Sequence, residues 1–188
     1  MPMKTVENIP TEQECFDLMK EHDMLPNIVA HSVQVRNVAL AIVDSLAESS
    51  PVNRDLVSAA ALLHDISKTR TIRTGEMRHD LIGGELLREL GYDEIATITE
   101  QHVVLDNFDP DGPLEEKEIV YYADKRVMHD KIVTINTRVD DLMDRYGRDN
   151  ERIRKMISDN RNFIMTVENK ITRFLVEDID TALSSLIK

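Results

Sequence analysis

Apolar residues recur along most of the chain at intervals of three and four, the spacing that gathers them on one face of an α-helix. The segment 26–48 is a clear example, and the C-terminal segment 150–187 is another, compatible with one long helix or two. We find no internal repeat, no low-complexity segment and no convincing strand. The pattern therefore predicts an all-α protein.

Turn and capping residues divide this pattern into separate helices. Asn53, shortly after Pro51, predicts the start of a helix that is apolar on most sides, and Asp93 predicts the cap of another helix. Gly91 and Gly147 stand where helices are expected to end. The predicted helices are 26–48, 53–67, 79–90, 94–104, 114–130 and 135–146, with loops at 69–78 and 106–113.

The length of 188 residues suits one ordinary domain with a real core. We expect a single helical domain over 1–188, with a core at about 26–130 and a C-terminal helical extension at about 131–188. The single cysteine, Cys15, excludes an internal disulfide framework and is expected to be a small buried residue. No apolar run reaches the roughly 20 residues that span a bilayer, and the N-terminus lacks the apolar stretch of a secretory signal. These features predict a cytoplasmic protein with no membrane partner.

The formal net charge of −12 argues against a partner that is a nucleic-acid polymer, because phosphate backbones attract clustered Lys and Arg. This net charge does not exclude a small anionic substrate. Such a substrate requires a local positive centre, made of basic side chains or of metal ions.

Several polar side chains fall on the apolar faces of five predicted helices, where a lone polar group is costly. They are His31, His64, Asp65, His79, His102 and Asp124. A single inward histidine is ordinarily bonded to a backbone carbonyl. Six such groups cannot all find carbonyls, because helix interiors leave none free. Imidazole nitrogens and carboxylate oxygens that converge in a helical core are the ligands of a transition-metal site, so we expect metal to be the partner of Asp65.

The order of these residues resembles that of the HD superfamily of metal-dependent phosphohydrolases. "HDISK" (64–68) is similar to the HDIG-type signature with its trailing lysine, and "YYADK" (121–125) is similar to the late helix that supplies the last aspartate. The similarity covers roughly residues 26–130. Ser67 stands where many members carry glycine. The resemblance implies an HD-domain helical bundle.

The resemblance also implies which residues bind metal. In the family the first histidine, the HD pair and the last aspartate hold one ion, and two further histidines hold a second ion with the HD aspartate bridging. The corresponding residues are His31, His64, Asp65 and Asp124 for the first ion, and Asp65, His79 and His102 for the second. We therefore expect two divalent transition-metal ions, of Fe, Mn, Co or Ni. Such a pair lowers the pKa of a bridging water and neutralises charge on a phosphoester.

Basic residues crowd the neighbourhood of this predicted site. Lys68 shares the helical side of Asp65 and is expected, with Asp65, to act in catalysis and to hold a phosphate oxygen; the alternative is a helix-end cation. We expect Arg70, Arg73 and Arg126 to bind the substrate as well, near Arg78 and Lys125, although ordinary surface ion pairs explain them equally well. His22 and His129 lie outside the pattern, and His129 belongs either behind a ligand or on the surface.

The leading function is hydrolysis of a small phosphoester, including nucleotides. The first alternative is a mixed-valent diiron oxygenase on the same ligands, which only the bound metal and its oxidation state separate from a hydrolase. The second alternative, a non-catalytic nucleotide sensor, would lack ligands, and none is missing. The C-terminal apolar stripe is expected to pack internally or to pair two subunits as a homodimer.

Overall fold

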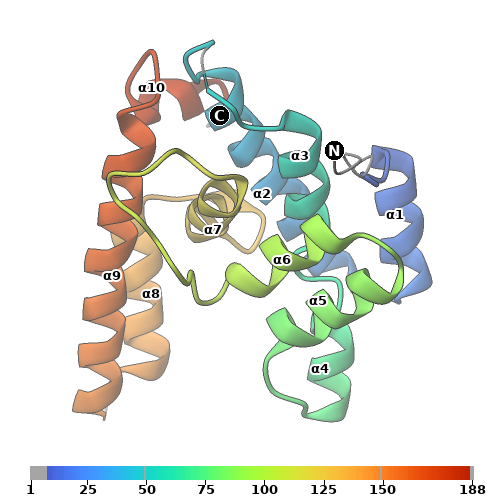
Figure 1. Cartoon of the computed structure of the whole chain (residues 1–188). Helices are drawn as coiled ribbons and strands as arrows, with labels where there is room; N and C mark the ends of the chain where they lie inside the picture. Colours follow the sequence, from blue (N-terminus) through green and yellow to red (C-terminus); the bar gives the residue numbers. More distant parts are fainter. Residues whose placement is uncertain (1–7, 49, 149, 187–188) are drawn as a thin grey trace.

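The computed structural model describes residues 8–48, 50–148 and 150–186. Helices dominate this part of the chain, which confirms the all-α prediction (Figure 1). They are α1 (Glu12–Glu21), α2 (Pro26–Asp44), α3 (Arg54–Leu63), α4 (Lys68–Thr74), α5 (His79–Glu89), α6 (Asp93–Gln101), α7 (Glu116–Lys125), α8 (Ile135–Tyr146), α9 (Glu151–Thr172) and α10 (Ile179–Leu183), with a 3-10 turn at Ser184–Leu186. A small hairpin, β1 (Val127–Met128) and β2 (Lys131–Ile132), joins α7 to α8.

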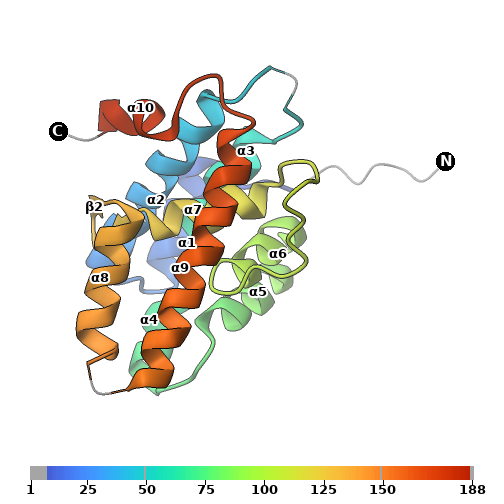
Figure 2. The ribbon, with the colours of Figure 1, turned by 90° about the vertical axis from the view of Figure 1, so that its left-hand side faces the viewer.

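Helix α7 runs through the middle of the molecule. Figure 1 shows α7 nearly end-on, with α2 and α3 on one side and the antiparallel pair α8–α9 on the other. Seen from the side in Figure 2, α9 crosses in front of α7 and reaches almost the full height of the molecule. Helices α5 and α6 pack against each other, and α6 also contacts α3 and α7. Helices α2, α3 and α6 therefore meet around α7, and α5, which carries His79, joins them through α6.

The structure confirms the predicted caps at Asn53 and Gly91 and contradicts the one at Asp93. The side chain of Asn53 accepts hydrogen bonds from the backbone N–H groups of Asp55 and Leu56, so the predicted start of α3 is confirmed. Gly91, with a φ of 86°, ends α5 as predicted. Asp93 is wrong as a cap: it is the first residue inside α6, and Tyr92 precedes it without a side-chain cap.

Two local predictions are wrong. The expected loop 69–78 contains α4, which buries only Thr69 and Thr71 and ends at Gly75 with a φ of 76°, so it leaves no apolar stripe in the sequence. The expected helix 114–130 stops at Lys125, and the chain then turns back with Val127 paired to Ile132. Strands of two residues are too short to produce an alternating pattern.

The C-terminal extension packs against α7, the helix that carries Asp124. The described part of the predicted segment 150–187, residues 150–186, contains the two helices α9 and α10, and the apolar stripe of α9 is buried at Ile164, Val167 and Ile171. Lys170 Nζ lies 2.7 Å from Glu118 Oε1 of α7, and both side chains are almost completely buried. Internal packing thus accounts for the stripe, and a homodimer stays a prediction.

The prediction that Cys15 is a small buried residue is borne out. Cys15 is completely buried, and its burial raises the pKa of the thiol to about 12. None of the described helices combines the length and the apolar character needed to cross a bilayer.

Candidate metal centre

Four histidines and two aspartates, up to 93 residues apart, converge beside α7. They come from the interior of α2, the turn after α3, the first residue of α5, the residue that ends α6 and the last turn of α7. We call these six side chains the ligand cluster: His31, His64, Asp65, His79, His102 and Asp124. The structure brings together every residue that the sequence analysis assigned to metal.

Asp65 lies at the centre of the ligand cluster and is completely buried. Its Oδ1 is 3.2 Å from His79 Nε2 and 3.5 Å from His102 Nε2, while its Oδ2 is 3.5 Å from His64 Nε2. The two oxygens of one carboxylate therefore face different histidines. This is the geometry expected of a carboxylate shared by two ions.

Asp124 faces the other side of the cluster. Its Oδ1 lies 3.0 Å from His31 Nε2 and 3.7 Å from His64 Nε2. Two groups of ligand atoms, each mutually within 4.8 Å, emerge: His31, His64 and Asp65 form one, and Asp65, His79 and His102 form the other. Asp65 belongs to both groups.

Backbone carbonyls orient three of the four imidazoles. The Nδ1 atoms of His31, His64 and His102 lie 2.8, 2.8 and 2.6 Å from the carbonyl oxygens of His129, Ala61 and Thr99. A carbonyl oxygen only accepts, so each Nδ1 carries a proton and each Nε2 is the nitrogen that faces the cluster.

This arrangement corrects one step of the sequence argument. Carbonyls are available, because Ala61 and Thr99 lie at helix ends and His129 lies in the hairpin turn. The histidines bind those carbonyls through Nδ1 and keep Nε2 for the cluster. The backbone carbonyl of His129 thus orients the candidate ligand His31.

The residues present fit a metal site. His64 Nε2 and Asp65 Oδ1 are buried and, within the described residues, have no hydrogen-bond partner. Neutral His31 would present a lone pair to the Asp124 carboxylate only 3.0 Å away, a contact that a cation between them makes favourable. Imidazole nitrogen with carboxylate oxygen is a donor set typical of divalent transition metals.

The electrostatics of the cluster keep both carboxylates ionised. Burial alone would raise the pKa of Asp65, but the charge on His64 and the adjacent imidazoles outweigh it and hold that pKa well below its usual range. Burial would likewise raise the pKa of Asp124, but the ammonium of Lys125 and the neighbouring His31 hold it well below its usual range. Ionised carboxylates are the form that binds cations.

Two lysines touch the cluster. Lys68 Nζ lies 2.7 Å from Asp65 Oδ2, and its side chain is 37% exposed, so it reaches both the cluster and solvent. Lys68 is the first residue of α4 rather than a continuation of α3. Lys125 Nζ donates to Asp124 Oδ2 at 2.7 Å and to the carbonyl oxygen of His102 at 2.8 Å. Lys125 is therefore occupied, whereas Lys68 has room for a further partner.

The three arginines expected to bind substrate contact residues outside the ligand cluster. Arg70 pairs with Glu76 through two hydrogen bonds, and Arg73 Nη1 lies 3.6 Å from Asp23 Oδ2, both on the surface. Arg126 is buried.

The guanidinium of Arg126 donates to the carbonyl oxygen of Val133, the hydroxyl of Tyr122 and a carboxylate oxygen of Asp180. These contacts tie α7 to the hairpin and to α10, so the expectation that Arg126 binds substrate is replaced by a structural role. Arg78, named with them, pairs with Asp80 at 2.7 Å.

A cavity of about 200 Å³ adjoins the cluster and includes Asp124 in its lining. Most of the cavity wall comes from α8 and α9, the extension for which the sequence analysis proposed no function. Arg138 of α8 is part of that wall. No sequence signal singled it out, because its proximity to the cluster depends on how α8 packs.

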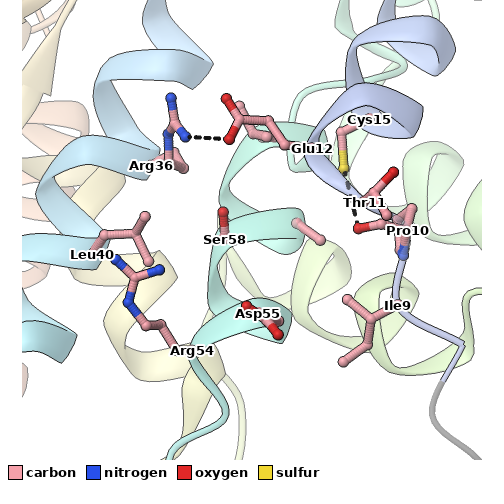
Figure 3. A pocket seen from close by; sticks show the side chains of 12 residues that line it. Ile9, Pro10, Thr11, Glu12, Cys15, Arg36, Leu40, Arg54, Asp55 and Ser58 are labelled. Atoms are coloured by element: carbon pink, nitrogen blue, oxygen red, sulfur yellow. Dashed lines mark hydrogen bonds and ion pairs between the residues drawn. The ribbon is translucent and has the colours of Figure 1, made fainter.

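A second cavity, of about 500 Å³, lies between α1, α2 and α3 and contains none of the predicted ligands (Figure 3). Three of its charged groups are paired: Arg36 Nη1 lies 3.2 Å from Glu12 Oε2, and Arg54 pairs with Asp44 at 2.7 Å. The residues that the sequence assigns to metal lie elsewhere, in the ligand cluster.

Comparison with known families agrees with this site. The family model described as HD domain matches residues 28–146, so the chain belongs to the HD-domain family. Members of this family characteristically bind divalent metals, in keeping with the ligand groups described above. The match includes α8, beyond the limit of about 130 inferred from the motifs.

Several relatives are at least 30% identical to this chain. A tRNA (cytidine(56)-2′-O)-methyltransferase of Picrophilus torridus is 32% identical over 78% of this chain and 44% of the relative, and one of Thermoplasma volcanium is 30% identical over 87% and 49%. The chain thus spans about half the length of these two. An uncharacterized protein of Methanocaldococcus jannaschii is 30% identical over 70% of this chain and 84% of the relative. Membership of the HD-domain family supports an enzyme. No solved structure matches significantly.

Proposed function

We propose that the chain is a metal-dependent phosphohydrolase that acts on a small phosphoester. The observation that carries this proposal is the membership of Asp65 in both groups of ligand atoms. A buried carboxylate shared in this way suits two ions, and paired ions are typical of phosphoester hydrolysis. The alternative sensor function is disfavoured because the cluster retains its complete set of ligands.

The distances between the ligand atoms support the ligand assignment. His31, His64, Asp65 and Asp124 would hold one ion, and Asp65, His79 and His102 would hold the other. Bound ions of this kind would supply an activated water and offset the negative charge of the phosphoryl oxygens.

The chain's own groups orient and charge the site. The carbonyls that bind the Nδ1 atoms keep the Nε2 atoms aimed inward. Lys68 holds Asp65 and remains partly exposed, so one of its remaining N–H groups is free to donate to a phosphate oxygen. The ammonium of Lys125 offsets the negative charge of Asp124 and holds this carboxylate in position.

The methyltransferase names of two relatives suggest a different activity. We infer hydrolysis rather than methyl transfer for this chain, because it spans about half of those relatives and its residues build a cluster of imidazoles and carboxylates. The net charge of −12 also opposes binding of the phosphates of tRNA.

The experiment that tests this function begins with protein purified without added metal and analysed for its elements. Phosphomonoesters, phosphodiesters and nucleotides are then assayed with added Mn²⁺, in air and without oxygen, beside the Asp65→Asn variant. Hydrolysis that is independent of oxygen and lost in the variant supports the proposal. Strict dependence on oxygen would favour the diiron oxygenase, and methylation of tRNA with no hydrolysis would overturn the proposal.

A further inference from the structure

The cavity of about 200 Å³ beside the ligand cluster has an apolar wall built mainly by the C-terminal extension. Seven of its ten lining residues belong to α8 and α9, and Asp124 and Lys125 of α7 are also part of its lining. The apolar side chains are Val103, Ile135, Val139, Leu142, Ile157 and Ile164. One boundary of the cavity is therefore a metal ligand, and the rest is largely hydrocarbon.

Arg138 is a weakly paired cation in this wall. Its side chain is 23% exposed, and its one ion pair, Nη1 to Asp141 Oδ2, is long at 3.7 Å. Its Nε is buried and has no hydrogen-bond partner within the described residues. A buried N–H group without a partner is costly, and an anion at the mouth of the cavity would satisfy it.

Arg138 and Lys68 each lie near one of the two carboxylates of the ligand cluster. Arg138 lines the cavity together with Asp124, and Lys68 Nζ lies 2.7 Å from Asp65 Oδ2 with its side chain 37% exposed. Both carboxylates approach His64 Nε2, Asp65 through Oδ2 at 3.5 Å and Asp124 through Oδ1 at 3.7 Å, so the two cations flank the same part of the cluster. Together they suit the double negative charge of a phosphomonoester.

The size of the cavity limits what it accepts. Pockets for drug-sized ligands occupy about 300–1,000 Å³, so this cavity suits a smaller group. An apolar cavity of about 150 Å³ is enough to bind benzene. Room for one ring, beside one phosphate position, matches an ester with a single organic substituent.

We propose that the substrate is a phosphomonoester of a compact, largely apolar alcohol or phenol, with its organic group in this cavity and its phosphate held by Arg138 and Lys68. This inference rests on the proposed function and assigns the C-terminal extension the task of selecting the substrate.

The test measures binding rather than turnover. Phenylphosphonate and methylphosphonate, which are not hydrolysed, are titrated by calorimetry into the full chain loaded with Mn²⁺. Wild type should bind phenylphosphonate at least about tenfold more tightly, because the ring buries apolar surface. Leu142→Trp should fill the cavity, cancel this preference and leave the affinity for methylphosphonate unchanged. Arg138→Gln should weaken both probes by about tenfold.

Matched controls are available on the same helices. Met156→Trp adds the same bulk beside Ile157, at a position that is 64% exposed and outside the cavity. Arg145→Gln removes another cation of α8 that also pairs with Asp141. Both should behave as wild type, and circular dichroism checks the fold of each variant. Equal affinity of wild type for the two probes, an unchanged preference in Leu142→Trp, or no binding of either probe would overturn the inference. The proposed function is judged separately, by turnover of phenyl phosphate and methyl phosphate.

Discussion

Lys68 Nζ lies 2.7 Å from Asp65 Oδ2, the carboxylate oxygen opposite the one that His79 and His102 approach. The lysine thus occupies the edge of the ligand cluster and leaves the inner oxygen to the histidines. Its partial exposure lets the same ammonium reach a bound anion. This position favours a role for Lys68 in holding substrate over the role of a helix-end cation.

Lys68→Ala is expected to retain its metal and to lower the rate of phosphoester hydrolysis by about one to three orders of magnitude, the range for loss of one charge-stabilising group. The loss should fall mainly on kcat if the contact tightens in the transition state. Steady-state kinetics and elemental analysis measure both. Lys20→Ala, an exposed cation of α1, is the control. Unchanged hydrolysis in Lys68→Ala would remove the proposed role.

Asp65→Ala should abolish hydrolysis and strongly weaken metal retention, because it removes the carboxylate common to both groups of ligand atoms. His22→Ala, outside the cluster, should leave both properties near wild type. Metal content after dialysis and initial rates provide the measurement. Equal effects of the two substitutions would show that the ligand set has been misassigned.

The number of ions is a separate prediction. Wild type should hold two divalent ions per chain, and the double variant His79→Ala/His102→Ala should hold one, because His31, His64, Asp65 and Asp124 remain. Elemental analysis against protein concentration gives the ratio. A single ion in wild type, with no loss in the double variant, would contradict the dinuclear site.

Metal affinity should fall as the pH falls. In the metal-free protein, burial alone would lower the pKa of His64, but the carboxylate of Asp65 outweighs burial and raises that pKa above its ordinary value. A metal ion must displace this proton, so protons compete with the ion as the pH drops. Competition with a chelator between about pH 6 and pH 8 measures the trend. Affinity that is constant over this range would contradict the assignment of His64.

The buried pair Lys170–Glu118 makes a prediction about stability. Lys170→Met leaves the Glu118 carboxylate buried without its partner, which is expected to cost about 3–5 kcal/mol of unfolding free energy. Urea unfolding measures the change. Lys155→Met breaks an exposed pair with Asp159 and should change stability by less than about 1 kcal/mol. The double variant Lys170→Met/Glu118→Met should recover much of the loss, and a loss as large as that of Lys170→Met would contradict this account.

Part of the candidate site could be predicted from sequence because burial is periodic. His31 and His102 share a helical face with apolar neighbours, so their inward direction follows from spacing alone. The start of α3 and the end of α5 followed from local chemistry, since Asn53 and Gly91 act within one turn of the chain. Helix α4 and the hairpin were not predicted, because these short elements bury too few residues to give a periodic pattern.

The sequence by itself determined the helical class and the polar residues that face inward, because both depend on interactions within a few residues. Tertiary structure alone decided that Asp65 meets His79 and His102, that Arg126 is bound by Asp180 rather than free for substrate, and that Arg138 of α8 stands beside Asp124. These contacts join segments far apart in the chain. The angles at which α7, α8 and α9 pack control them, and the local periodicity of a sequence does not specify those angles.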